Sequence, residues 1–299
     1  MQPSLFDSSD ADSPADPPGS PPAPSSGVVV REVDCRTVLN RTSLGDYSLN
    51  CYTGCAHGCA YCYARFMQRF HPHDEPWGAF VDVKRNALDV LRRQLRRAPP
   101  GEVFLSSACD GWQPIEAERR LTRRACAMLL EHGFRLHVLT KSALVLRDLD
   151  VFAGKDVRLG VTLTALDAGL AALWEPRAWS PAERIEVLRA ARRAGMATAV
   201  MFGPLLPSLC DDAESLHALF AVAAELGVDK IWVDAINPRP RVWPAVAALL
   251  RSRYSGLLET YRRILFDRAR RSEYLAALRR RVDEVARRAG MAGRTSACF

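Results

Sequence analysis

Residues 50–66 read NCYTGCAHGCAYCYARF, which places three cysteines on one short stretch of chain. Cys55, Cys59 and Cys62 form a C-x3-C-x2-C pattern. Three thiolates at this spacing can bind three irons of a [4Fe–4S] cube and leave the fourth iron without a protein ligand. An iron with an open position can bind and reduce a small molecule, whereas a cluster held by four cysteines mainly carries electrons. The stretch therefore predicts a reactive iron–sulfur site.

A structural zinc site is the main alternative, because C-x2-C pairs are common in zinc-binding proteins. Zinc usually takes four nitrogen or sulfur ligands, and Cys51 or His57 could supply the fourth. Unliganded core cysteines explain the stretch less well, since cores do not use cysteine at this density. Gly54 and Gly58 would let the loop turn tightly around a bulky cluster.

The same stretch resembles the radical S-adenosylmethionine (SAM) superfamily, in the branch grouped with spore photoproduct lyase and DNA repair photolyase-like proteins. Besides the cysteines, the residues that carry the resemblance are Asn50, Tyr52, Gly54, His57, Tyr61, Tyr63, Ala64 and Arg65. The resemblance implies that Cys55, Cys59 and Cys62 hold a [4Fe–4S] cluster and that SAM chelates its open iron. Reductive cleavage of SAM would then give a 5′-deoxyadenosyl radical. The branch usually has proline at position 51, so we expect Cys51 to be a substitution rather than a ligand.

Length and composition favour one large α/β domain with a small appendage, since the chain has 299 residues and 48% hydrophobic residues. The absence of a long apolar run and of a signal-like N-terminus predicts a protein that does not enter a membrane. Nine cysteines, several of them clustered, suit a reducing compartment, so we expect a cytoplasmic location. Residues 1–27 are rich in Pro, Ser and Asp and are expected to be disordered.

Strand-like and helix-like segments alternate along residues 28–240, which predicts a parallel sheet. The expected strands are Tyr47–Cys51, Val103–Ala108, Arg135–Thr140, Val157–Thr164, Ala197–Phe202 and Lys230–Ala235. The expected helices are Tyr61–Phe70, Phe80–Arg97, Glu118–His132, Ala143–Phe152, Ser180–Ala194 and Asp212–Leu226. Six such units match the partial (β/α)6 TIM-like barrel that the radical SAM resemblance implies. Basic helices over residues 241–299, expected at Val246–Arg253 and Leu257–Ala289, would form a C-terminal extension.

Unusual polar residues follow the expected strands, at the ends where barrel enzymes place their active sites. They fall at residues 50–65, 106–116, 140–142, 162–164, 203–212 and 235–239. After the second strand the family has a Thr-Asp-Pro-Tyr-Gln-Pro-x-Glu sequence. The residues of this chain that match it are Asp110, Gln113, Pro114 and Glu116. This coincidence of polar clusters with strand ends is a second argument for an enzyme.

Three of these clusters supply candidate SAM contacts in addition to Tyr61. Asp110 could accept hydrogen bonds from the SAM ammonium, and its alternative is a turn followed by a helix cap. Lys141 could pair with the SAM carboxylate, and its alternative is a solvated loop lysine. Thr162 could reach the ribose hydroxyls, or it could simply be a strand former.

Glu175 and Arg177 follow the fourth strand, where the family shows a similar stretch that contains Glu-Pro. They are candidates for binding SAM or substrate, and a surface ion pair is the alternative.

The catalytic candidate is Cys109. In spore photoproduct lyases a cysteine near the end of the second strand donates a hydrogen atom to the product radical. In the closest register Ser107 stands at that position and Cys109 follows two residues later. Alternate strand residues face the same side, so Cys109 could take over the role.

The sequence thus predicts a radical SAM enzyme that takes electrons from a donor such as a flavodoxin or ferredoxin. Damaged DNA is the substrate by analogy with the family, and RNA, a peptide or a small metabolite is the alternative. A third hypothesis is a non-enzymatic iron–sulfur or zinc protein that binds nucleic acid. Its phosphate contacts would come from Arg262–Arg288, which has ten Arg and four acidic residues.

Overall fold

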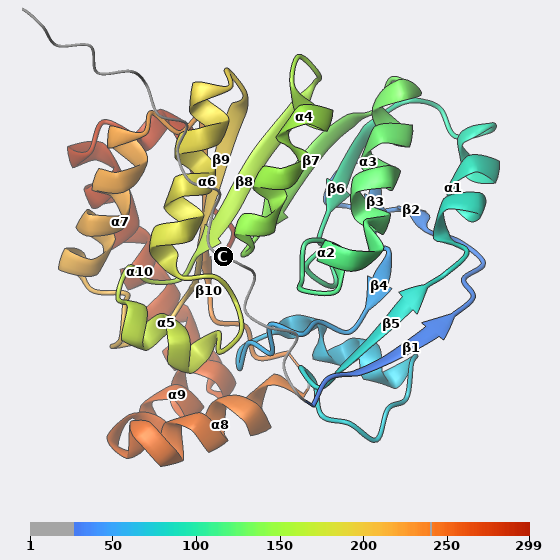
Figure 1. Cartoon of the computed structure of the whole chain (residues 1–299). Coiled ribbons are helices and arrows are strands. Elements are labelled where there is room, and N and C mark those ends of the chain that lie inside the picture. The colour runs from blue at the N-terminus through green and yellow to red at the C-terminus, as the bar shows by residue number, and fades with distance from the viewer. Residues whose placement is uncertain (1–26, 240) are drawn as a thin grey trace, which may run out of the picture.

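A computed structural model describes residues 27–239 and 241–299 (Figure 1). The expected disorder of residues 1–27 lies outside the described residues, apart from Gly27. The main sheet has eight strands in the order β11-β10-β9-β8-β7-β6-β3-β2, and a second sheet has the order β1-β5-β4. Their bounds are β1 Val29–Val33, β2 Leu39–Arg41, β3 Tyr47–Leu49, β4 Tyr52–Thr53, β5 Phe80–Lys84, β6 Glu102–Leu105, β7 Arg135–Thr140, β8 Val157–Leu163, β9 Ala197–Leu205, β10 Lys230–Ala235 and β11 Thr295–Ala297.

Helices connect the strands and continue beyond them. The α-helices are α1 Ala87–Leu95, α2 Glu116–Arg119, α3 Leu121–Glu131, α4 Leu149–Phe152, α5 Ala168–Trp174, α6 Pro181–Arg193, α7 Ala213–Glu225, α8 Val242–Arg253, α9 Leu258–Phe266 and α10 Arg268–Arg288. The 3₁₀ helices are η1 Tyr63–Arg69, η2 Ala143–Asp148, η3 Ser255–Leu257 and η4 Ala292–Arg294. In the described part of the chain, no helix combines the length and the apolar character that crossing a bilayer requires.

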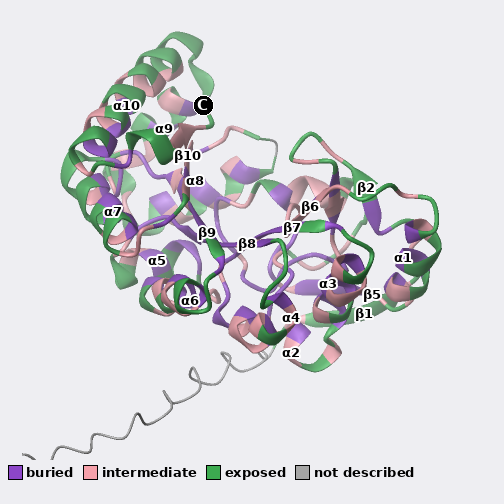
Figure 2. Cartoon of the chain, turned by 90° about the horizontal axis from the view of Figure 1, so that it is seen from above, coloured by how far each residue is buried: buried purple, intermediate pink, exposed green. Residues whose placement is uncertain are grey.

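The main sheet is an open barrel. All its neighbouring strands from β3 to β11 run parallel, and only the edge strand β2 is antiparallel to its neighbour. The sheet ends at β2 and β11, so the barrel does not close. Seen from above, α3, α4 and α6 lie along one side of the curved row of strands (Figure 2). The predicted α/β partial barrel is confirmed.

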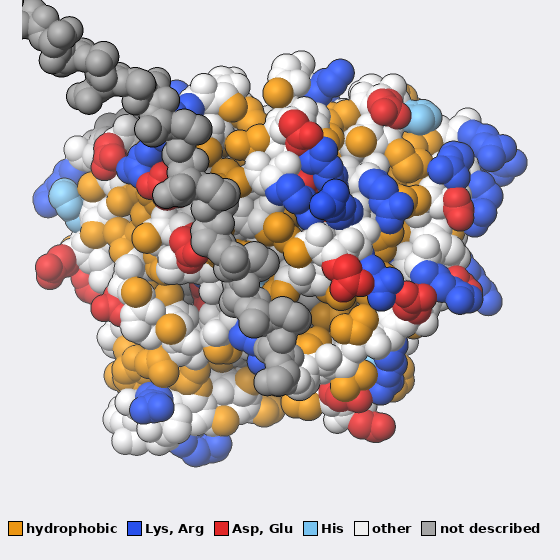
Figure 3. Space-filling view, viewed as in Figure 1, with side chains coloured by type: hydrophobic (Ala, Val, Ile, Leu, Met, Phe, Trp, Pro, Cys, Tyr) orange, Lys and Arg blue, Asp and Glu red, His pale blue; other side chains and the backbone are white. Residues whose placement is uncertain are grey.

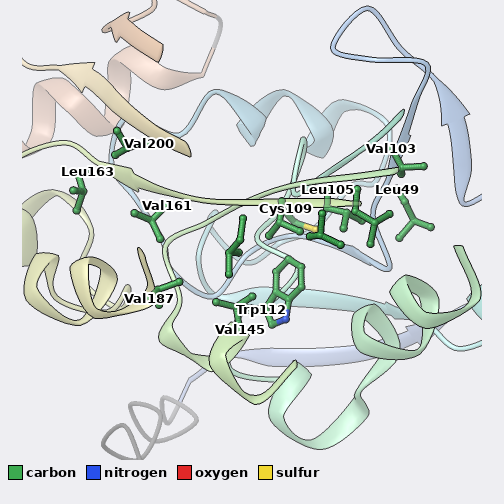
Figure 4. Packing of buried hydrophobic residues seen from close by; sticks show 14 of the residues in the cluster. Leu49, Val103, Leu105, Cys109, Trp112, Val145, Val161, Leu163, Val187 and Val200 are labelled. Carbon is green, nitrogen blue, oxygen red and sulfur yellow. The ribbon is translucent and has the colours of Figure 1, made fainter. Parts of the chain in front are cut away.

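The core between sheet and helices forms because β-branched and leucine side chains alternate along the strands. Val161 on β8 and Val200 on β9 are directly paired and fully buried. Figure 4 shows these residues in one cluster with Val187 of α6 and with Trp112 from the loop after β6. The same packing positions the loops that follow the strands.

Most expected elements lie within a few residues of the observed ones, and β7 and β10 have the expected bounds. Helix α6 begins with the expected capping box, in which Ser180 and Glu183 bond each other's backbone N–H. The expected helix Glu118–His132 is two helices, because Arg120 takes a left-handed conformation with φ 51°.

The expected helix Phe80–Arg97 is wrong in its first third. Phe80–Lys84 forms strand β5, which pairs with β1 on one side and with β4 on the other. Its partner strands come from residues 29–33 and 52–53, so local periodicity could not indicate them. Strand β11, which pairs with β10, and helix α5 were also missed.

We predict that Ser180→Ala lowers the free energy of unfolding by about 1 kcal/mol, because it removes the side-chain acceptor for the Glu183 N–H. Urea unfolding followed by circular dichroism measures this. Ser252→Ala is the matched control, since Ser252 is exposed near the end of α8, and it should change the value by less than about 0.5 kcal/mol. Equal losses in both variants would contradict the prediction.

Candidate functional site

The three thiols of the C-x3-C-x2-C pattern lie on the loop between β4 and η1. Cys55 and Cys59 are buried, Cys62 is half-buried, and all three are free. The Gly58 N–H donates to the Cys55 carbonyl and the Cys62 N–H to the Cys59 carbonyl, so the loop is a series of turns. Burial raises the pKa of Cys59 to about 12. Without a metal the thiol keeps its proton, and a metal would take the place of that proton.

The two loop glycines are required by backbone conformation and by close approach. Gly54 has φ +83° and Gly58 has φ +65°, both in the region that side chains rarely adopt. A Cβ on Gly54 would stand 2.5 Å from the carbonyl oxygen of Phe80 on β5. A Cβ on Gly58 would stand 2.7 Å from Nη2 of Arg177. The expected role of these glycines in a tight loop is thus supported by the geometry.

Gln113 and Arg177 hold the backbone of this loop. The fully buried Gln113 accepts from the Ala56 N–H at 2.8 Å and donates to the Gly54 carbonyl at 3.2 Å. Arg177 donates through Nε to the Ala56 carbonyl and through Nη2 to the Gly78 carbonyl. The segments after β6 and after α5 therefore clamp the thiol loop from two sides.

Asp110 connects the ends of β6 and β7. Its carboxylate accepts from the Trp112 N–H at 2.9 Å, the Thr140 hydroxyl at 2.7 Å and the Lys141 N–H at 2.8 Å. Its Oδ2 also lies 3.6 Å from Nδ1 of His57 in the thiol loop. Asp110 thus has four protein partners and connects the segments after β6 and β7 to the thiol loop.

His57 lies within the thiol loop and is almost fully buried. Its Nε2 has no hydrogen-bond partner among the residues that the structure describes. Burial lowers the pKa of His57 to about 4, although the Asp110 carboxylate acts in the opposite direction. His57 is therefore neutral near pH 7 and keeps one ring nitrogen available beside the cysteines.

Lys141 places a cation next to the thiols. Its Nζ lies 5.6 Å from the centre of the Tyr61 ring, and it has no ion pair or hydrogen bond within the described ranges. Burial acts to lower the pKa of Lys141, but its neighbours Cys59 and Glu175 act in the opposite direction, and the pKa is raised overall. The Lys141 ammonium is thus charged and has unused hydrogen-bonding capacity.

A buried polar network joins the ends of β8 and β9 to α6. Glu175 accepts from the Tyr61 hydroxyl and from the Thr164 hydroxyl, the latter at 3.0 Å, and forms an ion pair with Arg184. Arg184 also donates to the Thr162 carbonyl at 3.0 Å. The side chains of Glu175 and Arg184 are each only 1% exposed, so the alternative of a surface ion pair at Glu175 is wrong.

Sequence reasoning missed Arg184. It stands on the face of α6 that also carries Val187, Leu188 and Ala191, all of which are buried. Because an unpaired buried charge is very costly, an arginine on the apolar face of a helix indicates a buried acidic partner.

Cys109 lies in the core beside the site (Figure 4). Its thiol donates to the Tyr52 carbonyl at 3.4 Å and lies 3.7 Å from Oδ1 of Asn50. Burial raises the pKa of Cys109 to about 12. Cys51 is also buried, and its thiol lies near Thr122 and Glu116.

The three thiols are the donor set that a cluster held by three cysteines would need. Among residues 27–239 and 241–299, no three His, Cys, Asp or Glu side chains gather as one metal ion requires. A structural zinc ion needs four converging ligands. A cube spreads its three cysteine ligands over three irons and does not require that convergence.

A family model described as the Radical SAM superfamily matches residues 49–219. An uncharacterised protein of Mycobacterium tuberculosis is 30% identical over 263 residues, which cover 83% of this chain and 76% of that protein. An uncharacterised protein of Methanocaldococcus jannaschii is 31% identical over 190 residues, which cover 62% of this chain and 71% of that protein.

The fold is similar to solved structures of spore photoproduct lyase. The complex with dinucleoside spore photoproduct aligns with a TM-score of 0.66 and 16% identity, over 90% of this chain and 82% of that one. A mutant with bound AdoMet and dinucleoside spore photoproduct aligns with a TM-score of 0.65 and 17% identity, over 91% and 82%. At this identity the similarity concerns the fold.

We predict that Glu175→Ala lowers the free energy of unfolding by about 3–5 kcal/mol, because it leaves the Arg184 guanidinium buried without its counter-charge. Urea unfolding measures the loss. Glu186→Ala is the matched control on α6, the helix that carries Arg184, since Glu186 pairs with Arg189 at the surface, and its cost should stay below about 1 kcal/mol. A cost below that limit for Glu175→Ala would contradict the burial argument.

The ion pair between Glu175 and Arg184 also makes the free energy of unfolding depend on pH. Burial acts to raise the pKa of Glu175, but the charges of Arg184 and Lys141 outweigh it and lower the pKa overall. The carboxylate therefore stabilises the fold above its unfolded pKa of about 4.3, and this contribution is lost as the pH falls through the folded pKa. We expect the stability difference between wild type and Glu175→Gln to be full at neutral pH and to shrink below about pH 4. A difference that grows on acidification would contradict this.

Proposed function

Because this chain belongs to the radical SAM superfamily, we propose that it is an enzyme that cleaves SAM reductively at a [4Fe–4S] cluster bound by Cys55, Cys59 and Cys62. The observation that carries the proposal is the loop of three free, largely buried thiols beside the unpaired Lys141 ammonium. When bound and reduced, the cluster supplies the electron that converts SAM to methionine and a 5′-deoxyadenosyl radical, which takes a hydrogen atom from the substrate.

Gln113 and Arg177 support this chemistry by holding the loop backbone in one conformation. Both use their side-chain donors or acceptors on carbonyl and N–H groups of the loop and of Gly78. We therefore assign Arg177 to support of the thiol loop, in place of the SAM or substrate contact that the sequence suggested. Preorganised ligands avoid the cost of ordering the loop at the moment of binding.

Asp110, Tyr61 and Glu175 are also assigned to support. Each already has protein partners in the buried networks, and Oε2 of Glu175 forms the ion pair with Arg184. We propose that Lys141 binds the SAM carboxylate, since its ammonium lies beside the thiols and carries no ion pair in the described chain. Thr162, at the end of β8, is retained as the proposed contact to the ribose hydroxyls.

Damaged DNA is the substrate class that we propose to test first. The support is the fold similarity to spore photoproduct lyase, whose solved complex contains dinucleoside spore photoproduct. Cys109 is the proposed hydrogen-atom donor, because its raised pKa keeps the S–H bond that such a donor needs. RNA, peptides and small metabolites belong in the same substrate screen.

The reaction class is tested anaerobically. After reconstitution with iron and sulfide, protein incubated with SAM and dithionite should release 5′-deoxyadenosine, measured by mass spectrometry. Cys59→Ala should lose both the cluster and this product. Cys51→Ala is the matched control and should keep both, because Cys51 lies near Thr122 and Glu116. Retained product in Cys59→Ala, or bound zinc and no product in wild type, would overturn the proposal.

We predict that Lys141→Met weakens SAM binding roughly 10- to 100-fold, as expected for one hydrogen bond to a charged group. Equilibrium binding of labelled SAM to the reconstituted protein measures the change, with iron content determined in parallel. Lys155→Met removes the same charge from an exposed position and should leave binding unchanged. Unaltered SAM affinity in Lys141→Met at full iron content would exclude the assigned role.

A further inference from the structure

A cavity of about 620 Å³ lies between β2 and the C-terminal end of α1. We call it the arginine groove, because its lining includes Arg36, Arg41, Arg93, Arg96 and Arg97. No aspartate or glutamate lines it. We propose that the arginine groove binds the phosphodiester backbone of a nucleic acid.

The five arginines have no internal counter-charge. All are exposed, and none forms an ion pair or donates a side-chain hydrogen bond in the part of the chain that the structure describes. Arg92, the neighbour of Arg93 on α1, instead pairs with Asp89 at 2.7 Å. Five like charges around one cavity repel one another unless an anion binds there. The groove thus has a positive charge that no acidic side chain of the described residues neutralises.

The walls of the groove are held together before any ligand binds. Gln94 of α1 accepts from the N–H groups of Val38 and Leu39 at 3.0 and 3.1 Å and donates to the Leu39 carbonyl at 2.7 Å. These bonds fix the segment at the start of β2, with Arg36 and Arg41 on either side of it, against the helix that carries Arg93. The arginines therefore do not have to be brought together by the ligand.

One of the groove arginines, Arg41, is also held in a defined orientation by an aromatic ring. The Arg41 guanidinium lies 4.3 Å from the centre of the Tyr47 ring, and the Tyr47 hydroxyl donates to the Pro99 carbonyl at 3.1 Å. Stacking on an aromatic face leaves the edge of the guanidinium fork free, and that edge matches the oxygens of a phosphate.

The distribution of charge favours a polymer over a single small phosphate. The guanidinium groups come from residues 36–41 and 93–97 and are all at the surface, so they do not converge on one buried point. In Figure 3, Lys and Arg side chains gather at the right of the molecule, where Figure 1 places α1. Exposed arginines along a groove suit successive phosphates of one strand and carry no base recognition.

The arginine groove fits phosphate better than the Arg262–Arg288 segment that the sequence suggested. In that segment Arg287 and Arg288 pair with Glu284, and Arg270 pairs with Glu273. Three arginines of that segment thus have an acidic partner within the helix, whereas none of the five groove arginines forms an ion pair in the described chain.

The groove is separate from the candidate site, because the two lie at opposite ends of β3. Tyr47 lines the groove, and Asn50, three residues further on, bonds to Ser107 beside the thiol loop. Three strand residues span about 10 Å. Binding in the groove requires neither the cluster nor SAM, so it stands independently of the proposed function.

The test measures fluorescence anisotropy of a labelled DNA duplex of random sequence with the full-length protein, over a series of salt concentrations. Arg93→Gln/Arg97→Gln should weaken binding about tenfold and reduce the slope of log K against log salt by about 2, since each phosphate contact contributes about 0.9. Arg287→Gln/Arg288→Gln makes the same charge change in the paired segment and should leave affinity and slope close to wild type. Circular dichroism and release of 5′-deoxyadenosine should be unchanged in both variants.

Wild-type affinity in the groove variant would overturn the proposal, and so would equal losses in the two variants. Inorganic triphosphate is the competitor that distinguishes a site for a small phosphate. If it displaces DNA at micromolar concentration, the groove binds a compact polyphosphate and the proposal is wrong.

Discussion

The backbone of residues 54–57 is bonded to side chains that arrive from distant parts of the chain, and this constraint decides where the three thiols stand. Gln113 binds the loop through both atoms of its amide group, and Arg177 binds it through Nε to the Ala56 carbonyl and through its backbone N–H to the His57 carbonyl. A loop of turns with two left-handed glycines has little stability of its own. Its geometry therefore depends on the barrel, whose strand ends supply the clamps.

The same dependence explains why we propose that several candidate ligands support the site instead of binding SAM. Near the ends of parallel strands, polar side chains from different units meet in a small, largely buried volume. A buried carboxylate must find partners there, and Asp110 and Glu175 find them in neighbouring strand ends and in Arg184. Lys141 differs because its ammonium lies beside Cys59 with no ion pair among the described residues. Among the described residues of the site, the Lys141 ammonium and Nε2 of His57 are thus left without a protein partner.

On the surface too, charged side chains differ in whether they have a partner of opposite charge. Arginines on α9 and α10 have glutamates one turn away and pair with them locally. Arg41 of β2 and the arginines at the end of α1 form no such pair among the described residues and line one cavity together. Total charge alone points to the C-terminal helices, whereas the groove is distinguished by five arginines without ion pairs around one cavity.

The sequence by itself determined the alternation of strands and helices, the capping box at Ser180 and the cysteine spacing, because each is a local pattern in the order of residues. Only the tertiary structure decided that Phe80–Lys84 is a strand, since its partners lie at residues 29–33 and 52–53. It also decided the partners of Gln113 and Glu175 and the meeting of residues 36–41 with 93–97. These hydrogen bonds and ion pairs join residues that are far apart in the chain. A local sequence pattern does not indicate which distant residues will be in contact.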